Sequence, residues 1–470
     1  MLPQALLLLL QTWIVVADTQ QLPLNQLQTF SSATANPATY ALPVSPHLSV
    51  SVALCSYKLS NSPRFFVSNK SSFVPGPDDL GKPNVYEIDL GDGGLGSWTG
   101  AMNVSGTLAV YNATQVPFEV GVSDDGPIHQ TLDSLPEVGD TTASQVLLFS
   151  PPFSPPDFPV PTYPNYTLPP ANLSLPPEPA SPPDYSIFIA PTSSSALASL
   201  PRTGCAMRAS SGNVGVYEPA SASEGLWLRD AGGWRWQWFV NGMAPQTNYT
   251  AYAVKNGTQV TAPINFVTKS ATFSCPIVYG LPYCPSVAYA APIPGADPAT
   301  GVTAQTLPSE LSSYLISNIA NLTVMLTTLA CGRDLYSPLV TCADCLSAYR
   351  TWLCFVSLPR CAEYPSSSSS SSLPAPALQE QNATNPRNTA LPPYPENYTA
   401  VLPCVEVCNA ADRACPPFLG FRCPLPQYTA GSSYGVGFID SGVDGQVGGG
   451  STGTAADQWG NVWCNYGGVL

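Results

Sequence analysis

The residues of this chain with the most distinctive chemistry are its 14 cysteines, nine of which lie between Cys331 and Cys423. The chain has only two histidines, so this density favours covalent cross-links over a cysteine–histidine metal centre. Spacing does not fix connectivity, and it leaves open whether Cys55 and Cys205 join each other or the C-terminal part. The cysteines that we expect in structural disulfides are Cys284, Cys331, Cys342, Cys345, Cys354, Cys361, Cys404, Cys408, Cys415, Cys423 and Cys464.

Cys342 and Cys345 have C-x-x-C spacing, which also occurs in redox centres and zinc knuckles. A redox centre is expected in a thioredoxin-like βαβ context, and a zinc knuckle needs a second matched pair in a reducing compartment. The sequence provides neither context, so we interpret both residues as structural. Disulfides in this number predict an extracytosolic protein.

The sequence offers little support for catalysis or for a bound cofactor. It contains no G-x-S-x-G elbow, no phosphate-binding glycine loop and no H-E-x-x-H motif. Two carboxylates would suffice for a glycosidase, but nothing marks such a pair. Asp124-Asp125-Gly126 lacks the acidic ladder of a calcium loop and is interpreted as a turn. We therefore expect no enzyme activity, no cofactor and no metal site.

Composition limits both the fold and the partners of the chain. With 52 prolines, 36 glycines and 10% charged residues, short strands and loops should dominate, and the 44% hydrophobic content is enough for real cores. A net charge of −14 without a basic stripe argues against nucleic acid as a partner.

The N-terminus and the glycosylation motifs point to the secretory pathway. Residues 1–18 contain an apolar core from Ala5 to Ala17, which fits a signal peptide, although an uncleaved anchor is the alternative. Asn-X-Ser/Thr acceptor motifs recur along the chain and predict a glycoprotein. They lie at Asn69, Asn103, Asn112, Asn165, Asn172, Asn248, Asn256, Asn321, Asn382 and Asn397.

The N-terminal half is predicted to be mainly β, as one or two sandwiches. Residues 19–150 alternate apolar and polar positions between Gly, Pro and Asp turns, and a proline-rich insert or linker follows at 151–183. Residues 184–275 form a second β-domain, in which the segment from Met243 to Tyr249 resembles the tyrosine corner of fibronectin type III domains. Trp234, Trp236 and Trp238 alternate onto one face, which is either core or a platform for stacking glycans.

Residues 276–470 are predicted to form a cysteine-rich helical domain, with a disordered loop at about 365–395. A first helix follows from apolar residues spaced by three and four between Leu311 and Leu329, with a cap at Pro308-Ser309. A second helix spans about Cys342 to Val356 and carries cysteines on different faces, which can tie it to more than one neighbour.

The stretch YSPLVTCADCLSAYRTWLCFVSLPRC, residues 336–361, resembles the signature of the fungal MID-type family, the stretch-activated regulatory component of the high-affinity calcium channel. LPCVEVC, CPPFLGFRCP and the terminal WGNVWCN are similar to that family as well. Its cysteine-rich part is in turn similar to the auxiliary subunits of the animal sodium-leak channel and, more loosely, to frizzled-type cysteine-rich domains.

The resemblance implies a glycoprotein of the endoplasmic reticulum and the extracellular face of the plasma membrane. Its partner would be the pore-forming four-repeat calcium-channel α subunit, and its role would be to support calcium influx as an accessory subunit. Membrane association would come through that partner or through an uncleaved leader. The alternative is a secreted cell-wall or ligand-binding glycoprotein that stacks glycans on the tryptophan face.

Aromatic residues and arginine dominate the energetics of protein interfaces, so they are our candidates for partner binding on the cysteine-rich domain. Tyr349 and Trp352 could equally belong to the core. The candidates are Tyr349, Arg350, Trp352, Phe355, Arg360, Phe418 and Phe421.

Overall fold

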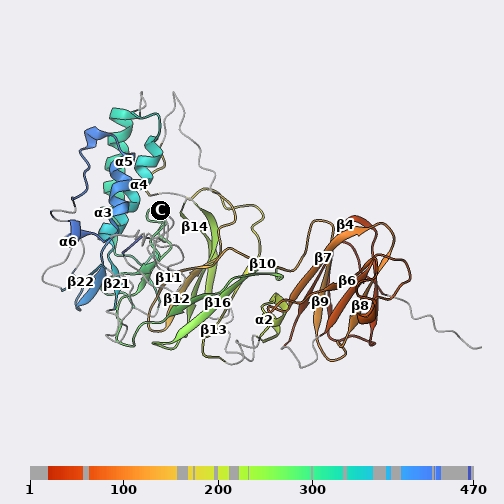
Figure 1. Cartoon of the computed structure of the whole chain (residues 1–470). Coiled ribbons are helices and arrows are strands. Elements are labelled where there is room, and N and C mark those ends of the chain that lie inside the picture. Colours follow the sequence, from red (N-terminus) through yellow and green to blue (C-terminus); the bar gives the residue numbers. More distant parts are fainter. Residues whose placement is uncertain are drawn as a thin grey trace, which may run out of the picture. The chain divides into compact units, whose positions relative to one another are not determined.

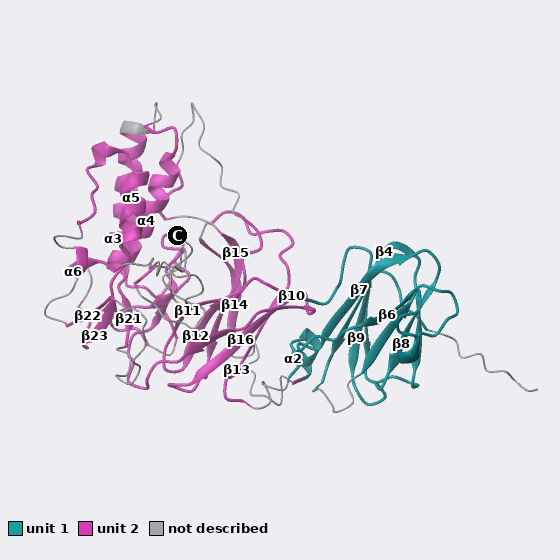
Figure 2. Cartoon of the chain, in the orientation of Figure 1, with its two compact units in different colours: residues 1–130, 199–209 teal, residues 131–198, 210–470 magenta. Residues whose placement is uncertain are grey.

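The computed structural model divides the chain into two compact units, which Figure 2 shows in different colours. Unit 1 comprises Met1–Gln130 and Ser199–Ala209, and unit 2 comprises Thr131–Ala198 and Ser210–Leu470. The structure describes residues 20–56, 63–155, 168–172, 175–194, 200–210, 222–230, 232–297, 300–331, 336–363, 377–382, 393–425, 428, 430–435 and 464–466. The expected signal peptide at 1–18 and residues 156–167 of the proline-rich insert lie outside these ranges.

Unit 1 is built from two sheets that share one apolar core. The first sheet has the order β1-β3-β8-β5-β6, with β1 at Gln20–Gln21, β3 at Ala38–Leu42, β8 at Gly106–Tyr111, β5 at Arg64–Ser68 and β6 at Val85–Ile88. The second has the order β2-β9-β4-β7, with β2 at Gln26–Phe30, β9 at Phe118–Ser123, β4 at Ser45–Leu54 and β7 at Leu95–Met102. Val50 and Val52 of β4 and Val120 of β9 meet Phe65 and Val110 of the first sheet in this core. The 3-10 helix η1 at Pro77–Asp79 and helix α2 at Gly204–Ser210 complete the unit.

The β-part of unit 2 also consists of two sheets around one core. One sheet has the order β10-β17-β16-β13, with β10 at Gln130–Leu132, β17 at Gln259–Thr261, β16 at Asn248–Lys255 and β13 at Tyr185–Pro191, and β18 at Ile264–Val267 also pairs with β16. The other has the order β11-β12-β15-β14, with β11 at Glu137–Thr141, β12 at Gln145–Phe149, β15 at Gly233–Asn241 and β14 at Ala222–Asp230. β11 and β12 precede residue 150, yet they belong to this sheet rather than to unit 1. β11 pairs with β12, and β12 pairs with β15, with Leu147 and Leu148 opposite Phe239 and Trp238.

The helical part of unit 2 follows the β-part along the chain and appears as coiled ribbons in Figure 1. Its elements are α3 at Ser309–Met325, the π-helix η3 at Leu326–Ala330, α4 at Cys342–Ser357, α5 at Val405–Ala414, the 3-10 helix η4 at Pro417–Leu419 and α6 at Gly431–Ser433. Short strands accompany the helices: β19 at Ile277–Val278 with β20 at Tyr289–Ala290, and the sheet β21-β23-β22 formed by Arg360–Ala362, Tyr398–Val401 and Leu378–Gln381.

The caps of α3 and α4 differ in a way that their sequences explain. Thr341 caps α4 through a reciprocal capping box with Asp344, as the T-x-x-D spacing allows. Pro308 occupies the corresponding place before α3, but it makes no side-chain hydrogen bond, because proline has no polar side-chain atom to offer. The first turn of α4 is therefore the better fixed of the two starts.

The prediction of a disordered loop at about 365–395 is wrong for part of this range. Residues 378–381 form β22, which pairs with β23 from Leu378 opposite Val401 to Gln381 opposite Tyr398. The backbone hydrogen bonds of this strand and the burial of Gln381 hold it in place, whereas the sequence showed only a polar tract there. Residues 364–376 and 383–392 lie outside the described ranges.

Tyr249 occupies the corner of the β-part that its motif predicted. The side chain is fully buried, and its hydroxyl oxygen accepts a hydrogen bond from the backbone N–H of Ala244 at 2.8 Å. We expect Tyr249→Phe to lower the free energy of unfolding by about 1 kcal/mol, because it removes the hydrogen bond between the buried ring and the backbone N–H of Ala244. Urea unfolding of the purified chain measures this, with the exposed Tyr428 changed to Phe as the control. Equal effects of the two substitutions would contradict the role assigned to the corner.

Candidate partner-binding surface

A buried group of charges fixes the helical part of unit 2 to its β-part. Asp140 of β11 accepts hydrogen bonds from Lys269 Nζ at 2.5 Å and from Arg360 Nε at 2.9 Å. Arg360, the first residue of β21, also donates to the carbonyl of Gly139 at 3.0 Å. Ala290 N–H donates to the second carboxylate oxygen of Asp140 at 3.1 Å, so β20 is held to the same point. One carboxylate thus links β11, β20 and β21, and the disulfide Cys275–Cys361 attaches β21 as well.

The charges in this group set the protonation of Asp140. Burial alone would raise the pKa of Asp140, but the adjacent Arg360 and Lys269 outweigh it and hold that pKa below its ordinary value. Burial lowers the pKa of Lys269, and the neighbouring Asp140 carboxylate opposes this shift. The carboxylate and the two cations therefore form a buried ion cluster in which the single negative charge is shared.

The 14 cysteines form seven disulfides, and three of these bonds attach α4 to three different neighbours. Cys342 joins Cys331 just after η3, Cys345 joins Cys415 at the end of α5, and Cys354 joins Cys284 in the segment before α3. The remaining pairs are Cys55–Cys205, Cys275–Cys361, Cys404–Cys464 and Cys408–Cys423. Such bonds restrict the unfolded chain, and they hold together helices that also share an apolar core.

A half-buried aromatic cluster lies along α4, made of Tyr349, Trp352 and Phe421. Its ring centroids are 5.4 Å apart for Tyr349 and Trp352, 4.8 Å for Trp352 and Phe421, and 6.1 Å for Tyr349 and Phe421. The indole N–H of Trp352 donates to the hydroxyl of Tyr434 at 2.9 Å. The rings are therefore held in defined orientations while part of their surface is still accessible.

Exposed apolar side chains gather at one end of the helical part, which we call the apolar tip. The disulfides Cys331–Cys342 and Cys345–Cys415 bring the end of α3, the start of α4 and the end of α5 together. Tyr336 Oη donates to the carbonyls of Ala414 and Thr341, which fixes the loop before α4 against α5. The exposed residues of the tip are Leu339 at 91%, Phe418 at 51%, Val324 at 62% and Met325 at 42%.

Two of the partner-binding candidates lie in the interior and are therefore withdrawn as surface residues. Phe355 is 1% exposed and stacks on Tyr289, with centroids 5.7 Å apart, and on Tyr466 at 6.3 Å. Arg360 points to Asp140, as described above. Their partners come from distant parts of the chain, so the spacing of residues in this stretch could not reveal their burial. The remaining candidates are Tyr349, Arg350, Trp352, Phe418 and Phe421.

The tryptophan face of β15 offers no platform for stacking glycans. Trp234 and Trp238 are buried, and Trp238 lies in the core shared by the two sheets. Trp236 packs against that core, and its indole N–H donates to the carbonyl of Pro183 at 2.8 Å. The stripe is therefore core, and the glycan-binding alternative loses the feature on which it was based.

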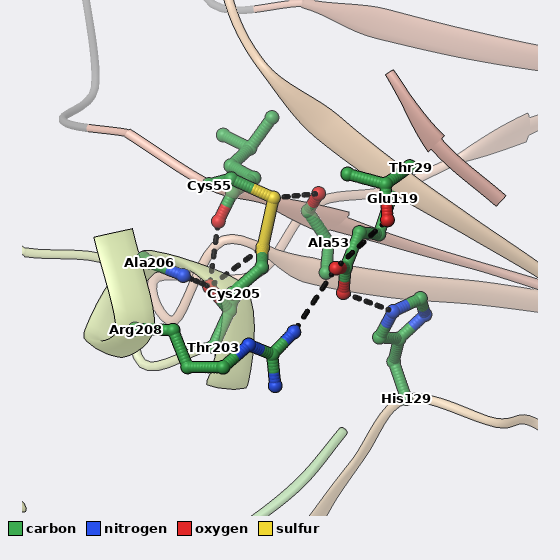
Figure 3. Close-up of a disulfide and its surroundings, with 10 residues drawn as sticks. Thr29, Ala53, Cys55, Glu119, His129, Thr203, Cys205, Ala206 and Arg208 are labelled. Carbon is green, nitrogen blue, oxygen red and sulfur yellow. Dashed lines mark hydrogen bonds and ion pairs between the residues drawn. A yellow bond between two sulfur atoms is a disulfide. The ribbon is translucent and has the colours of Figure 1, made fainter. Parts of the chain in front are cut away.

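Unit 1 contains a polar chain that the sequence did not suggest, next to the disulfide Cys55–Cys205 (Figure 3). Ser51 Oγ lies 3.1 Å from His129 Nδ1, and His129 Nε2 lies 3.4 Å from Glu119 Oε2. The order resembles a hydrolase triad, but Ser51, His129 and Glu119 are 0%, 4% and 3% exposed, so no substrate can reach the serine hydroxyl.

Glu119 is held as a carboxylate by its neighbours. Burial would raise its pKa, but hydrogen bonding to His129, the charge of Arg208 and a hydrogen bond from Thr29 together place the pKa below its ordinary value. Arg208 of α2 donates to Glu119 Oε1 at 3.1 Å. The two nearby sulfurs of Cys55 and Cys205 are bonded to each other, so they do not offer metal ligands. We interpret this group as structural.

The acceptor asparagines lie where glycans would have room. Asn165 falls outside the described residues, and Asn69 is half-buried. The others are exposed: Asn103, Asn112, Asn172, Asn248, Asn256, Asn321, Asn382 and Asn397. Within the described ranges, none of the helices combines the length and apolarity needed to cross a membrane.

Comparison with known proteins identifies relatives over most of the chain. The model of the Mid1 family, described as the stretch-activated Ca²⁺-permeable channel component, matches residues 64–468. Stretch-activated cation channel MID1 of Cryptococcus neoformans var. grubii is 35% identical over 415 residues, covering 79% of this chain and 65% of that protein. Stretch-activated cation channel yam8 of Schizosaccharomyces pombe is 28% identical over 263 residues, covering 54% of this chain and 52% of that protein. The chain thus spans 52–65% of the length of these two relatives.

Among solved structures, the fibronectin domains FN1–FN3 of chicken CNTN1 align with 54% of this chain and 69% of theirs. The identity is 9% and the TM-score is 0.17, which carries no argument about fold.

Proposed function

The chain belongs to the Mid1 family of stretch-activated Ca²⁺-permeable channel components, and from this we propose that it is an extracellular accessory subunit of a plasma-membrane calcium channel. It supports calcium influx by binding the pore-forming four-repeat α subunit rather than by forming the pore. The observation that carries this proposal is the apolar tip of the helical part, because exposed apolar side chains held by disulfides are typical of a surface that binds another protein.

The remaining features of the proposal follow from the same assignment. The protein passes through the endoplasmic reticulum, receives glycans and acts on the outer face of the plasma membrane. The β-part of unit 2 is a fibronectin-III-like domain, for which the Tyr249 corner is the support, and the cysteine-rich part is a frizzled-like domain. The domain division is a signal peptide, a first β-domain, a proline-rich linker, a second β-domain and the cysteine-rich domain. The disulfides are structural, and the partner is bound by the candidates that lie at the surface.

Affinity purification of the tagged full chain from detergent-solubilised cells tests the proposal. We expect a large four-repeat channel polypeptide to co-purify with the wild-type chain. In the double variant L339D/F418D the amount recovered should fall by about tenfold or more, because two charges replace apolar contacts of the tip.

The matched control is L80D, which places the same charge on an exposed leucine of unit 1. Calcium uptake by cells that express each variant should follow the amount of channel recovered. Recovery of the wild-type chain without any channel polypeptide would refute the proposed function. If L339D/F418D and L80D recovered equal amounts of the channel polypeptide, the apolar tip would not be the binding surface.

A further inference from the structure

Arg350 of α4 is a half-buried cation that has no acidic partner in the part of the chain that the structure describes. It lies on the helix face of Leu346 and Leu353, four residues before and three residues after it, and both leucines are buried in the core of the helical part. Burial lowers the pKa of Arg350 to about 10. Among the described residues no carboxylate forms an ion pair with its guanidinium, and no carbonyl accepts a hydrogen bond from it.

The other buried or half-buried arginines that the structure describes in unit 2 each form an ion pair with an acidic residue. Arg229 and Arg235 both pair with Glu137, and Arg360 pairs with Asp140. Arg413 and Arg422, which have no ion pair among the described residues, are exposed and remain hydrated. Removing a charge from water without a partner costs free energy, so Arg350 is an exception to the way this fold treats its cations.

The surroundings of Arg350 suggest which kind of group would pair with its charge. The guanidinium group presents a planar fork of N–H donors that matches a carboxylate, and this pairing is strongest where water is excluded. Tyr349 precedes Arg350 in α4 and Trp352 follows two residues after it, and both rings belong to the half-buried aromatic cluster with Phe421. An acidic side chain with an apolar neighbour would satisfy both the cation and these rings.

We propose that Arg350 is the docking point for an Asp or Glu side chain of the partner polypeptide, whose adjacent apolar residue packs on the aromatic cluster of Tyr349, Trp352 and Phe421. The proposal rests on the proposed function and specifies the chemistry of the partner segment. A protein carboxylate is favoured over an anionic lipid headgroup because the chain carries a net charge of −14, which opposes approach to an anionic membrane surface.

The test compares the full chain with the variants R350Q and R350K and with the control R413Q, using co-purification of the channel polypeptide. We expect the amount of channel polypeptide recovered with R350Q to fall by about 30-fold or more, because this variant removes one partner of a desolvated charge pair. R350K should recover an amount between those of the wild type and R350Q, since lysine keeps the charge but lacks the planar fork of donors. R413Q should stay close to the wild type.

Thermal unfolding of the same variants separates docking from a structural role. R350Q should be as stable as the wild-type chain or more stable, because the free protein no longer holds an unpaired cation. A drop in stability that parallels the loss of channel would overturn the proposal, and so would undiminished recovery with R350Q. Binding to phosphatidylserine vesicles that disappears in R350Q would assign the arginine to a lipid headgroup instead. Failure of both the wild type and R413Q to recover channel would refute the proposed function itself.

Discussion

Replacing Asp140 with asparagine is expected to lower the free energy of unfolding of unit 2 by about 3–5 kcal/mol, the cost of leaving buried charges without their partner. Asparagine has nearly the same shape but no charge, so Lys269 and Arg360 would face each other as two cations in the interior. The loss should appear in urea unfolding monitored by tryptophan fluorescence, because β15 of the same sheet contains Trp234 and Trp238.

The matched control for this prediction is Asp133→Asn, seven residues earlier and exposed, which should change stability by less than about 0.5 kcal/mol. Adding Lys269→Met to the Asp140→Asn variant should recover part of the loss, because one of the two unpaired cations is removed. If D140N and D133N unfold at the same urea concentration, the ion cluster does not hold the β-part and the helical part together.

Asp140 also makes the stability of the chain depend on pH. Because the pKa of folded Asp140 lies below its ordinary value, its stabilising contribution is complete above the unfolded pKa of about 4 and is lost as the pH falls through the lowered folded pKa. The wild-type chain should therefore lose stability in this acid range. In D140N that part of the pH dependence should be absent, and a profile parallel to that of the wild type would contradict the assignment.

The parts of the fold that the sequence predicts well are those decided by neighbours along the chain. The leucine spacing indicates α3, the cysteines on different faces of α4 indicate more than one disulfide neighbour, and the Pro-Gln-Thr-Asn-Tyr segment indicates the corner at Tyr249. In each of these cases the period of the element or the local backbone geometry determines the contact.

The features that the sequence does not reveal depend on residues far apart in the chain. Asp140 and Arg360 are separated by 220 residues, and neither lies in a motif. Cys55 and Cys205 could be paired only once residues 199–209 were known to return to unit 1. Phe355 shares α4 with Trp352, yet only the positions of Tyr289 and Tyr466 make it interior. Helical spacing tells which residues share a face, but not which face another segment will cover.

Removing the disulfide between Cys345 and Cys415, as C345A/C415A, is expected to lower the free energy of unfolding by about 4 kcal/mol, because the bond closes a long loop in the unfolded chain. The bond spans 70 residues and joins the first turn of α4 to the residue that ends α5. Its loss should also release the loop of Leu339, so that binding of the channel polypeptide falls together with stability.

The comparison for this variant is C408A/C423A, which removes a bond that spans only 15 residues. The chain-entropy argument predicts a smaller loss of about 3 kcal/mol there, and α5 would still be attached to α4 through Cys345–Cys415. Urea unfolding under non-reducing conditions gives both values, and co-purification of the channel gives the functional effect. If C345A/C415A bound the channel as well as C408A/C423A did, the surface that binds would not depend on the junction of α4 and α5, and the apolar tip would have to be replaced by another face of the helical part.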